Sequence, residues 1–324
     1  TAAINYALML RTVNRLQGAR SVLATALARG TPTFELHLVM AEVMHVLEEP
    51  QQTRRHALAA LRQAVGMKVA WSLVPALPHP SPDAAAWRAL LADCLQRLQP
   101  LDADACLAGG AVRMFALHGG LPDARKDIDI AIDARVSHEA LLAAFASGYR
   151  PFARQGQRVP PPGQIGVLGL VHEGTSIPVD LMLQARDGGR WRGSFGPPAH
   201  LVFDTPAFTI GEVACAQIDL PLPMPMPMEE YLRWIYGADW REETQQVGGR
   251  AIPRSYLQKG LFSPALDPAS HGVALTRALI SLAVYISQGQ ASAAMALCDQ
   301  ILAVEAIECV RLLREQLPRD GLAA

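Results

Sequence analysis

The residues with the clearest potential for chemistry are two aspartates, Asp127 and Asp129, at the start of the alternating segment 127–132. Successive side chains of a strand point to opposite faces, so the three isoleucines of this segment are expected to face the core and both aspartates to project from the other side. Neighbouring carboxylates repel each other unless a cation lies between them. Oxygen-only ligands suit Mg²⁺ or Mn²⁺, either of which can neutralise charge during phosphoryl transfer.

A glycine pair, Gly109 and Gly110, precedes a predicted helix. These residues have no side chain to block a phosphate, and the unpaired N–H groups at a helix start attract anions. Arg113, about one turn further on, can add a fork of hydrogen-bond donors. An Asp-x-Asp pair alone more often marks a solvated strand face, and a glycine pair alone is even weaker evidence for a functional site. Their succession in this order favours a functional site.

A third carboxylate is expected on a neighbouring strand, and the alternating segment 177–183 supplies Asp180. Its apolar residues share one face, so Asp180 lies on the other. A charged residue inside such a strand is unfavourable unless it is paired or bound to a metal. Asp180 is therefore expected to be a metal ligand or a base toward an acceptor hydroxyl, with a water-facing edge-strand aspartate as the alternative.

These motifs, in this order, resemble the nucleotidyltransferase fold of the polymerase-β superfamily, and more narrowly the LicD/fukutin-related family of phosphotransferases. The resemblance covers about residues 100–245. The chain differs from the family in having Arg125 and Lys126 where a longer acidic cluster is frequent. The matching segments are Gly110–Arg113, Gly119–Pro122, Asp127–Asp129, Val179–Asp180, Tyr231–Leu232, Tyr236–Gly237 and Asp239–Trp240.

The resemblance implies transfer of a phospho-alcohol, such as phosphocholine or ribitol phosphate, from a CDP-activated donor to a glycan hydroxyl. Asp127 and Asp129, with Asp180 as a third candidate ligand, would hold Mg²⁺ or Mn²⁺ on the diphosphate. Arg113 and Lys126 would steady its charge.

The segment from Tyr231 to Trp240 has two interpretations. Tyr231, Trp234 and Ile235 share one helical face, which indicates core packing. Tyr236 or Trp240 would instead stack on the nucleotide base or sugar if the segment belongs to the donor site.

Two alternative functions remain open. The first is a nucleotidyltransferase that transfers NMP to a small molecule or protein and releases pyrophosphate. The second is a non-catalytic helical-repeat interaction protein whose central domain is degenerate.

The elements that must position these residues define a fold with about two domains, as the length of 324 residues suggests. Residues 1–97 show helical periodicity similar to tetratricopeptide repeats, 98–255 a catalytic domain, and 256–324 a second helical region. We expect an α/β (α+β) fold with a mixed-sheet core between helical regions, which are candidates for binding a protein partner. Strands are predicted at 128–132, 166–171, 177–183 and 208–213, and Pro221–Met228 as an extended surface segment.

The composition argues against several classes of protein. Twenty-nine basic and thirty acidic residues give a net charge of −1, which argues against binding to nucleic acid mainly by charge. The five cysteines lack metal-site spacing and indicate reduced thiols. Residues 1–30 do not have the pattern of a secretory signal, and the longest apolar stretch, 278–286, is shorter than the roughly 20 residues of a membrane span. We therefore expect a cytoplasmic protein without a membrane span.

Overall fold

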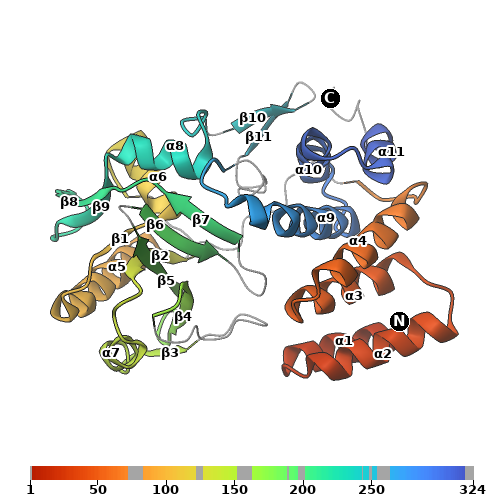
Figure 1. Cartoon of the computed structure of the whole chain (residues 1–324), viewed down its shortest axis with the longest axis horizontal. Coiled ribbons are helices and arrows are strands. Elements are labelled where there is room, and N and C mark those ends of the chain that lie inside the picture. Colours follow the sequence, from red (N-terminus) through yellow and green to blue (C-terminus); the bar gives the residue numbers. More distant parts are fainter. Residues whose placement is uncertain are drawn as a thin grey trace.

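The computed structural model describes residues 2–71, 83–121, 127–151, 163–187, 190–195, 201–242, 244–247, 250–253 and 263–317. Helices gather at one side of the molecule and a mixed β-sheet with its own helices at the other (Figure 1). We call these the helical unit, α1–α4 with α9–α11, and the α/β unit, α5–α8 with β1–β9. This arrangement confirms the expected mixed α/β class.

The helical unit joins the two ends of the chain. Leu61 of the N-terminal helices shares a buried core with Leu279 and Ile301 of the C-terminal ones. The two helical regions expected at opposite ends therefore pack together, because each has an apolar face that needs a partner. Its helices are α1 (Ala2–Thr12), α2 (Leu16–Arg29), α3 (Phe34–Val46), α4 (Pro50–Ala64), α9 (His271–Ser287), α10 (Ala291–Val304) and α11 (Glu308–Gln316).

Helix α5 (Ala84–Leu98) belongs to the α/β unit, although the expected boundary at residue 97 assigned it to the N-terminal helices. Its buried residues Trp87, Leu91 and Cys94 lie in the core beneath the sheet. The indole Nε1 of Trp87 also donates a hydrogen bond of 3.2 Å to the carbonyl of Asp127. The helix thus helps to fix the backbone that enters the central strand. The four prolines at positions 75, 78, 80 and 82 predict a linker, because each removes a helix hydrogen-bond donor, and they lie outside the described residues.

The main sheet has the order β1-β2-β5-β4-β3, and β6 and β7 extend it from β5. Strands β2 and β5 are parallel, and the other described pairs are antiparallel. Three of the predicted strands are confirmed here as β2, β4 and β5. The strands are β1 (Ala105–Leu107), β2 (Ile128–Asp133), β3 (Tyr149–Pro151), β4 (Gly166–His172), β5 (Pro178–Asp187), β6 (Arg190–Phe195) and β7 (Leu201–Thr205).

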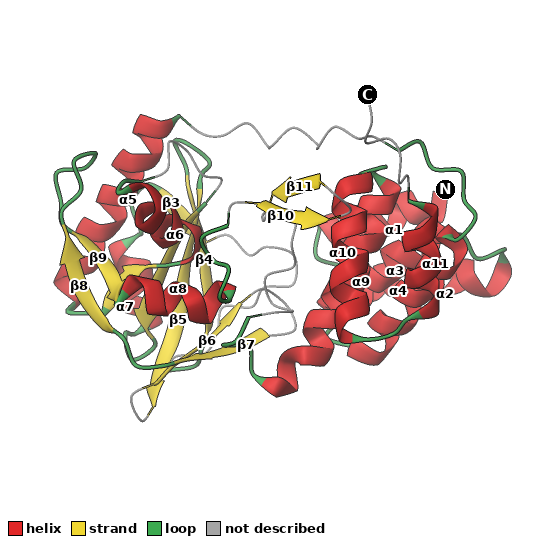
Figure 2. Ribbon diagram, turned by 90° about the horizontal axis from the view of Figure 1, so that it is seen from above, coloured by secondary structure: helices red, strands yellow, loops and turns green. Residues whose placement is uncertain are grey.

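The remaining helices of this unit are α6 (Gly109–His118), α7 (His138–Ala144) and α8 (Met228–Tyr236). Short 3₁₀ turns occur at η1 (Gln99–Leu101) and η4 (Pro268–Ser270), and a small hairpin joins β10 (Thr244–Val247) to β11 (Arg250–Pro253). Figure 2 shows the helical unit beside the strands from a second direction.

The proline-alternating segment corrects one prediction. It contains strand β9 (Leu222–Met226), which pairs antiparallel with β8 (Thr209–Val213), the fourth predicted strand. Leu222 and Met224 are fully buried in the α/β core, so the segment is not a surface lead-in. The prolines are tolerated because the two-stranded sheet gives β9 a ladder partner on one side only.

Strand β7 connects the two units. Leu201 and Phe203 pack in the core of the helical unit. The Val202 amide donates to the Ser270 hydroxyl at 3.0 Å, and the Asp267 amide donates to the Val202 carbonyl at 2.8 Å. The start of α9 is thereby attached to the sheet.

One described helical segment, Pro268–Ser287, is long and apolar enough to cross a membrane by length and composition alone. In its most apolar 18-residue window, 56% of the residues are buried inside the protein. Its apolar side chains are therefore largely covered by the helical core.

Candidate functional site

The structure brings the three candidate carboxylates together. Asp129 on β2 and Asp180 on β5 are direct register partners in the parallel pair, and Asp127 immediately precedes β2. One carboxylate oxygen from each residue lies within 4.8 Å of the other two. Asp180 is buried, whereas Asp127 and Asp129 are half-buried. Three acidic groups from two stretches of sequence therefore share one small volume.

The chemistry of this donor set fits a hard divalent cation. Mg²⁺ binds oxygens at about 2.0–2.1 Å in an octahedron, which puts adjacent ligand oxygens about 3 Å apart and opposite ones about 4.2 Å apart. The three carboxylate oxygens of the cluster lie within 4.8 Å of one another, which is close to the separation of opposite ligands. Small side-chain rotations would therefore bring them to the spacing that the cation requires. Without a cation, two ionised carboxylates at 4.8 Å repel by about 3 kcal/mol at an effective dielectric constant of about 20.

The start of α6 lies against this cluster, and Gly109 is the point of contact. A Cβ atom placed on Gly109 would lie 3.0 Å from Oδ2 of Asp129. The backbone of Gly109 also has a φ of +58°, which side chains rarely adopt. The amide of the preceding residue, Ala108, donates to the Asp129 carbonyl at 3.1 Å. Glycine is therefore required here by both close approach and backbone conformation.

Gly110 follows as the second residue of α6 and is buried. The Gly109–Gly110 motif thus places the first turn of α6 beside the Asp129 carboxylate. This juxtaposition of a helix N-terminus and a carboxylate cluster is the geometry expected where a metal-bound phosphate is held.

Tyr231 on α8 supports the start of α6, a role that its assignment to core packing did not predict. Burial raises the pKa of its phenol well above the ordinary value, while the backbone amide of Gly109 hydrogen-bonds to its hydroxyl and opposes this shift. The ring packs edge-on against Phe208, with ring centroids 5.2 Å apart. Core packing of Tyr231 is confirmed, and its hydroxyl adds a link between α8 and Gly109.

Arg113 contacts a different part of the chain from the one expected. Its Nε donates to the carbonyl of Trp240 and its Nη2 to the carbonyl of Glu242, each at 2.6 Å. These donors hold the backbone that follows α8 against α6. The interpretation of Arg113 as a phosphate-binding fork is corrected to this extent, because two of its donors are used within the protein.

The interpretation of Trp240 as a residue that stacks on a base or sugar is also corrected. Its side chain is only 1% exposed and belongs to the α/β core, so its ring does not form a stacking surface for a base or sugar. The guanidinium of Arg241 lies 4.4 Å from the ring centroid. Tyr236 is half-buried and packs against the same core. Lys126 lies outside the described residues.

The arrangement therefore combines a carboxylate set whose geometry suits a divalent cation with a helix start. These two features can position a phosphate ester and stabilise charge that develops on it. No protein-family model matches this chain, and no curated protein matches its sequence.

Proposed function

We propose that the chain is a divalent-metal-dependent transferase of phosphorus-containing groups with a nucleotidyltransferase-like core. The observation that carries the proposal is the meeting of Asp127, Asp129 and Asp180 within 4.8 Å. Three ionised carboxylates this close repel one another unless a cation lies between them. The cluster also lies beside α6, whose N-terminus at Gly109 would face a phosphate.

The three aspartates would hold Mg²⁺ or Mn²⁺, which when bound neutralises negative charge on the phosphate oxygens. The parallel ladder between β2 and β5 keeps Asp129 and Asp180 side by side, so this pair changes little on binding. Gly109, which has no side chain, lets the start of α6 approach the Asp129 carboxylate closely. A carboxylate oxygen that does not contact the cation would accept the proton of an acceptor hydroxyl.

The finer proposal is transfer of a phospho-alcohol from a CDP-activated donor to a glycan hydroxyl, with CMP as the leaving group. Its support is the order of the sequence motifs, which resembles the LicD/fukutin-related family over about residues 100–245. The carboxylate cluster would equally serve NMP transfer, which releases pyrophosphate. The product therefore distinguishes the two reactions.

The test is incubation of the pure protein with Mg²⁺ or Mn²⁺ and a panel of CDP-choline, CDP-ribitol and nucleoside triphosphates, followed by phosphorus NMR. Metal-dependent release of CMP supports phospho-alcohol transfer, and release of pyrophosphate supports NMP transfer. D127N should abolish either signal, and D219N, which changes an exposed aspartate outside the cluster, should not. Full activity in D127N would overturn the proposal.

A further inference from the structure

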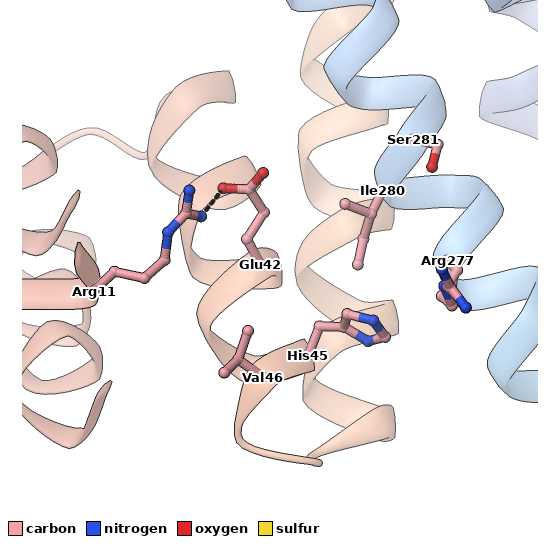
Figure 3. A pocket seen from close by; sticks show the side chains of 7 residues that line it. All are labelled: Arg11, Glu42, His45, Val46, Arg277, Ile280 and Ser281. Atoms are coloured by element: carbon pink, nitrogen blue, oxygen red, sulfur yellow. Dashed lines mark hydrogen bonds and ion pairs between the residues drawn. The ribbon is translucent and has the colours of Figure 1, made fainter. Parts of the chain in front are cut away.

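A second candidate site lies in the helical unit, away from the carboxylate cluster. A cavity of about 310 Å³ opens where α1, α3 and α9 meet. This volume is at the lower end of the range of small-molecule sites. Its lining residues are Arg11, Glu42, His45, Val46, Arg277, Ile280 and Ser281 (Figure 3).

The charges around this cavity do not balance. Arg11 forms an ion pair with Glu42, so these two side chains neutralise each other. Arg277 on α9 has neither an ion pair nor a hydrogen bond to any residue that the structure describes. Its burial lowers the pKa of the guanidinium, and no carboxylate in the described part of the chain offsets that effect. Among the residues that the structure describes, one positive charge is thus left without a counter-charge.

His45 adds a hydrogen-bonding group next to this charge. Figure 3 shows its ring extending from α3 toward Arg277. Burial, and then the nearby charge of Arg277, lower the pKa of His45 to about 4. The imidazole is therefore neutral at pH 7 and has one N–H to donate. Ser281 contributes a hydroxyl, while Val46 and Ile280 supply apolar wall.

We propose that this cavity binds a small organic oxyanion, a metabolite with a phosphate or carboxylate group, through the guanidinium of Arg277. The planar fork of arginine matches the paired oxygens of both groups. A half-buried charge without a partner is less favourable than one in water, and an anion in the cavity supplies a partner. The apolar wall formed by Val46 and Ile280 would contact the carbon skeleton of the ligand.

The test uses the full chain after passage over a chelating resin, so that no divalent cation at the carboxylate cluster contributes to binding and no soluble chelating anion competes for the cavity. Isothermal titration with inorganic phosphate and with citrate, at matched ionic strength in chloride, should show saturable binding of at least one of them at one site per chain. The probe that binds with the higher affinity shows whether the cavity prefers a phosphate or a carboxylate group.

Variants locate the binding. R277Q should weaken affinity at least tenfold, whereas R55Q, which removes the same charge from an exposed position on α4, should leave it unchanged. D127N should also bind normally, which separates this cavity from the proposed transferase site. Absence of saturable binding in the wild-type chain, or equal binding in R277Q, would overturn the proposal.

A second readout does not depend on the folding of a variant. With isotope-labelled histidine, the bound anion should shift the imidazole signals of His45 and leave those of exposed His271 in place. Binding that leaves the His45 signals unmoved contradicts the assignment of the anion to this cavity.

Discussion

Asp129 and Asp180 lie directly opposite each other in the parallel pair of β2 and β5. Paired residues of neighbouring strands project from the same face, so their carboxylates are brought together by the backbone ladder itself. On its other side, Asp180 is opposite Gly169 of β4, which has no side chain to occupy that face. The acidic pair therefore stands at the centre of the sheet with a side-chain-free position beside it.

Neutralising one aspartate of the cluster should change metal binding and stability in opposite directions. In EDTA, D127N should melt a few degrees above the wild-type chain, because it removes repulsion among carboxylates that lie within 4.8 Å. Adding Mn²⁺ should raise the melting temperature of the wild-type chain and not that of D127N. Differential scanning calorimetry with and without Mn²⁺ measures both effects. An equal Mn²⁺ response in D127N and the exposed-site control D219N contradicts the metal site.

The glycine at the start of α6 allows a matched comparison. G109A combines left-handed strain with a contact of 3.0 Å to Oδ2 of Asp129. G119A has the same kind of strain, with a φ of +69°, but its added Cβ meets nothing within 4 Å. Each variant should lose about 1–2 kcal/mol of stability from the backbone. Only G109A should also weaken Mn²⁺ binding, by about tenfold or more, as measured by titration calorimetry. Equal Mn²⁺ affinities in the two variants would show that Gly109 does not position Asp129.

Local sequence patterns were sufficient to predict much of the site. The alternation of isoleucines placed Asp127 and Asp129 on one strand face, and the alternation around Asp180 placed it on another. What no local pattern contains is the register between two strands. That Asp129 faces Asp180 depends on the β2–β5 ladder, which joins residues about fifty positions apart.

The structure corrects the interpretation of Arg113 in part, and that of Trp240 fully, for the same reason. Arg113 donates to a carbonyl 127 positions along the chain, and Trp240 is buried by the elements that surround this contact. An arginine near a helix start and an aromatic residue after a helix look the same in sequence whether they face a ligand or the protein. The packing of the two helical regions into one unit was likewise hidden, because each has an apolar face that could have met the sheet instead.

Arg113 should prove to be a positioning residue for the segment after α8. R113K keeps the charge but a single ammonium cannot reproduce the two-pronged contact with the carbonyls of Trp240 and Glu242. We expect a stability loss of about 1–3 kcal/mol and faster amide hydrogen exchange around residues 237–242. R233K, at an exposed position of α8, serves as the control and should change neither. A raised KM for the donor with unchanged hydrogen exchange would instead restore the phosphate-binding interpretation.

A histidine pair between α3 and α4 should make the stability of the helical unit depend on pH. The Nδ1 atoms of His37 and His56 lie 3.0 Å apart. Burial lowers the pKa of both rings, and for His56 the charges of His37 and Arg55 add to this effect and bring the pKa to about 4. The unfolded chain, with a histidine pKa of about 6.5, therefore binds protons between pH 6.5 and 4 that the folded chain does not.

The sign of the effect follows from this difference. Stability from the neutral pair is fully present above about pH 6.5 and is lost as the pH falls toward 4, by at most about 1.4 kcal/mol per pH unit for each proton. The melting temperature should thus fall between pH 7 and 5. H56Q, which keeps a hydrogen-bonding side chain but does not titrate, should flatten that fall, leaving residual contributions from the other histidines with lowered pKa values, His37, His45 and His138. H271Q, at an exposed position, should melt with the wild-type pH dependence. Parallel curves for H56Q and the wild-type chain would show that the pair does not control acid stability.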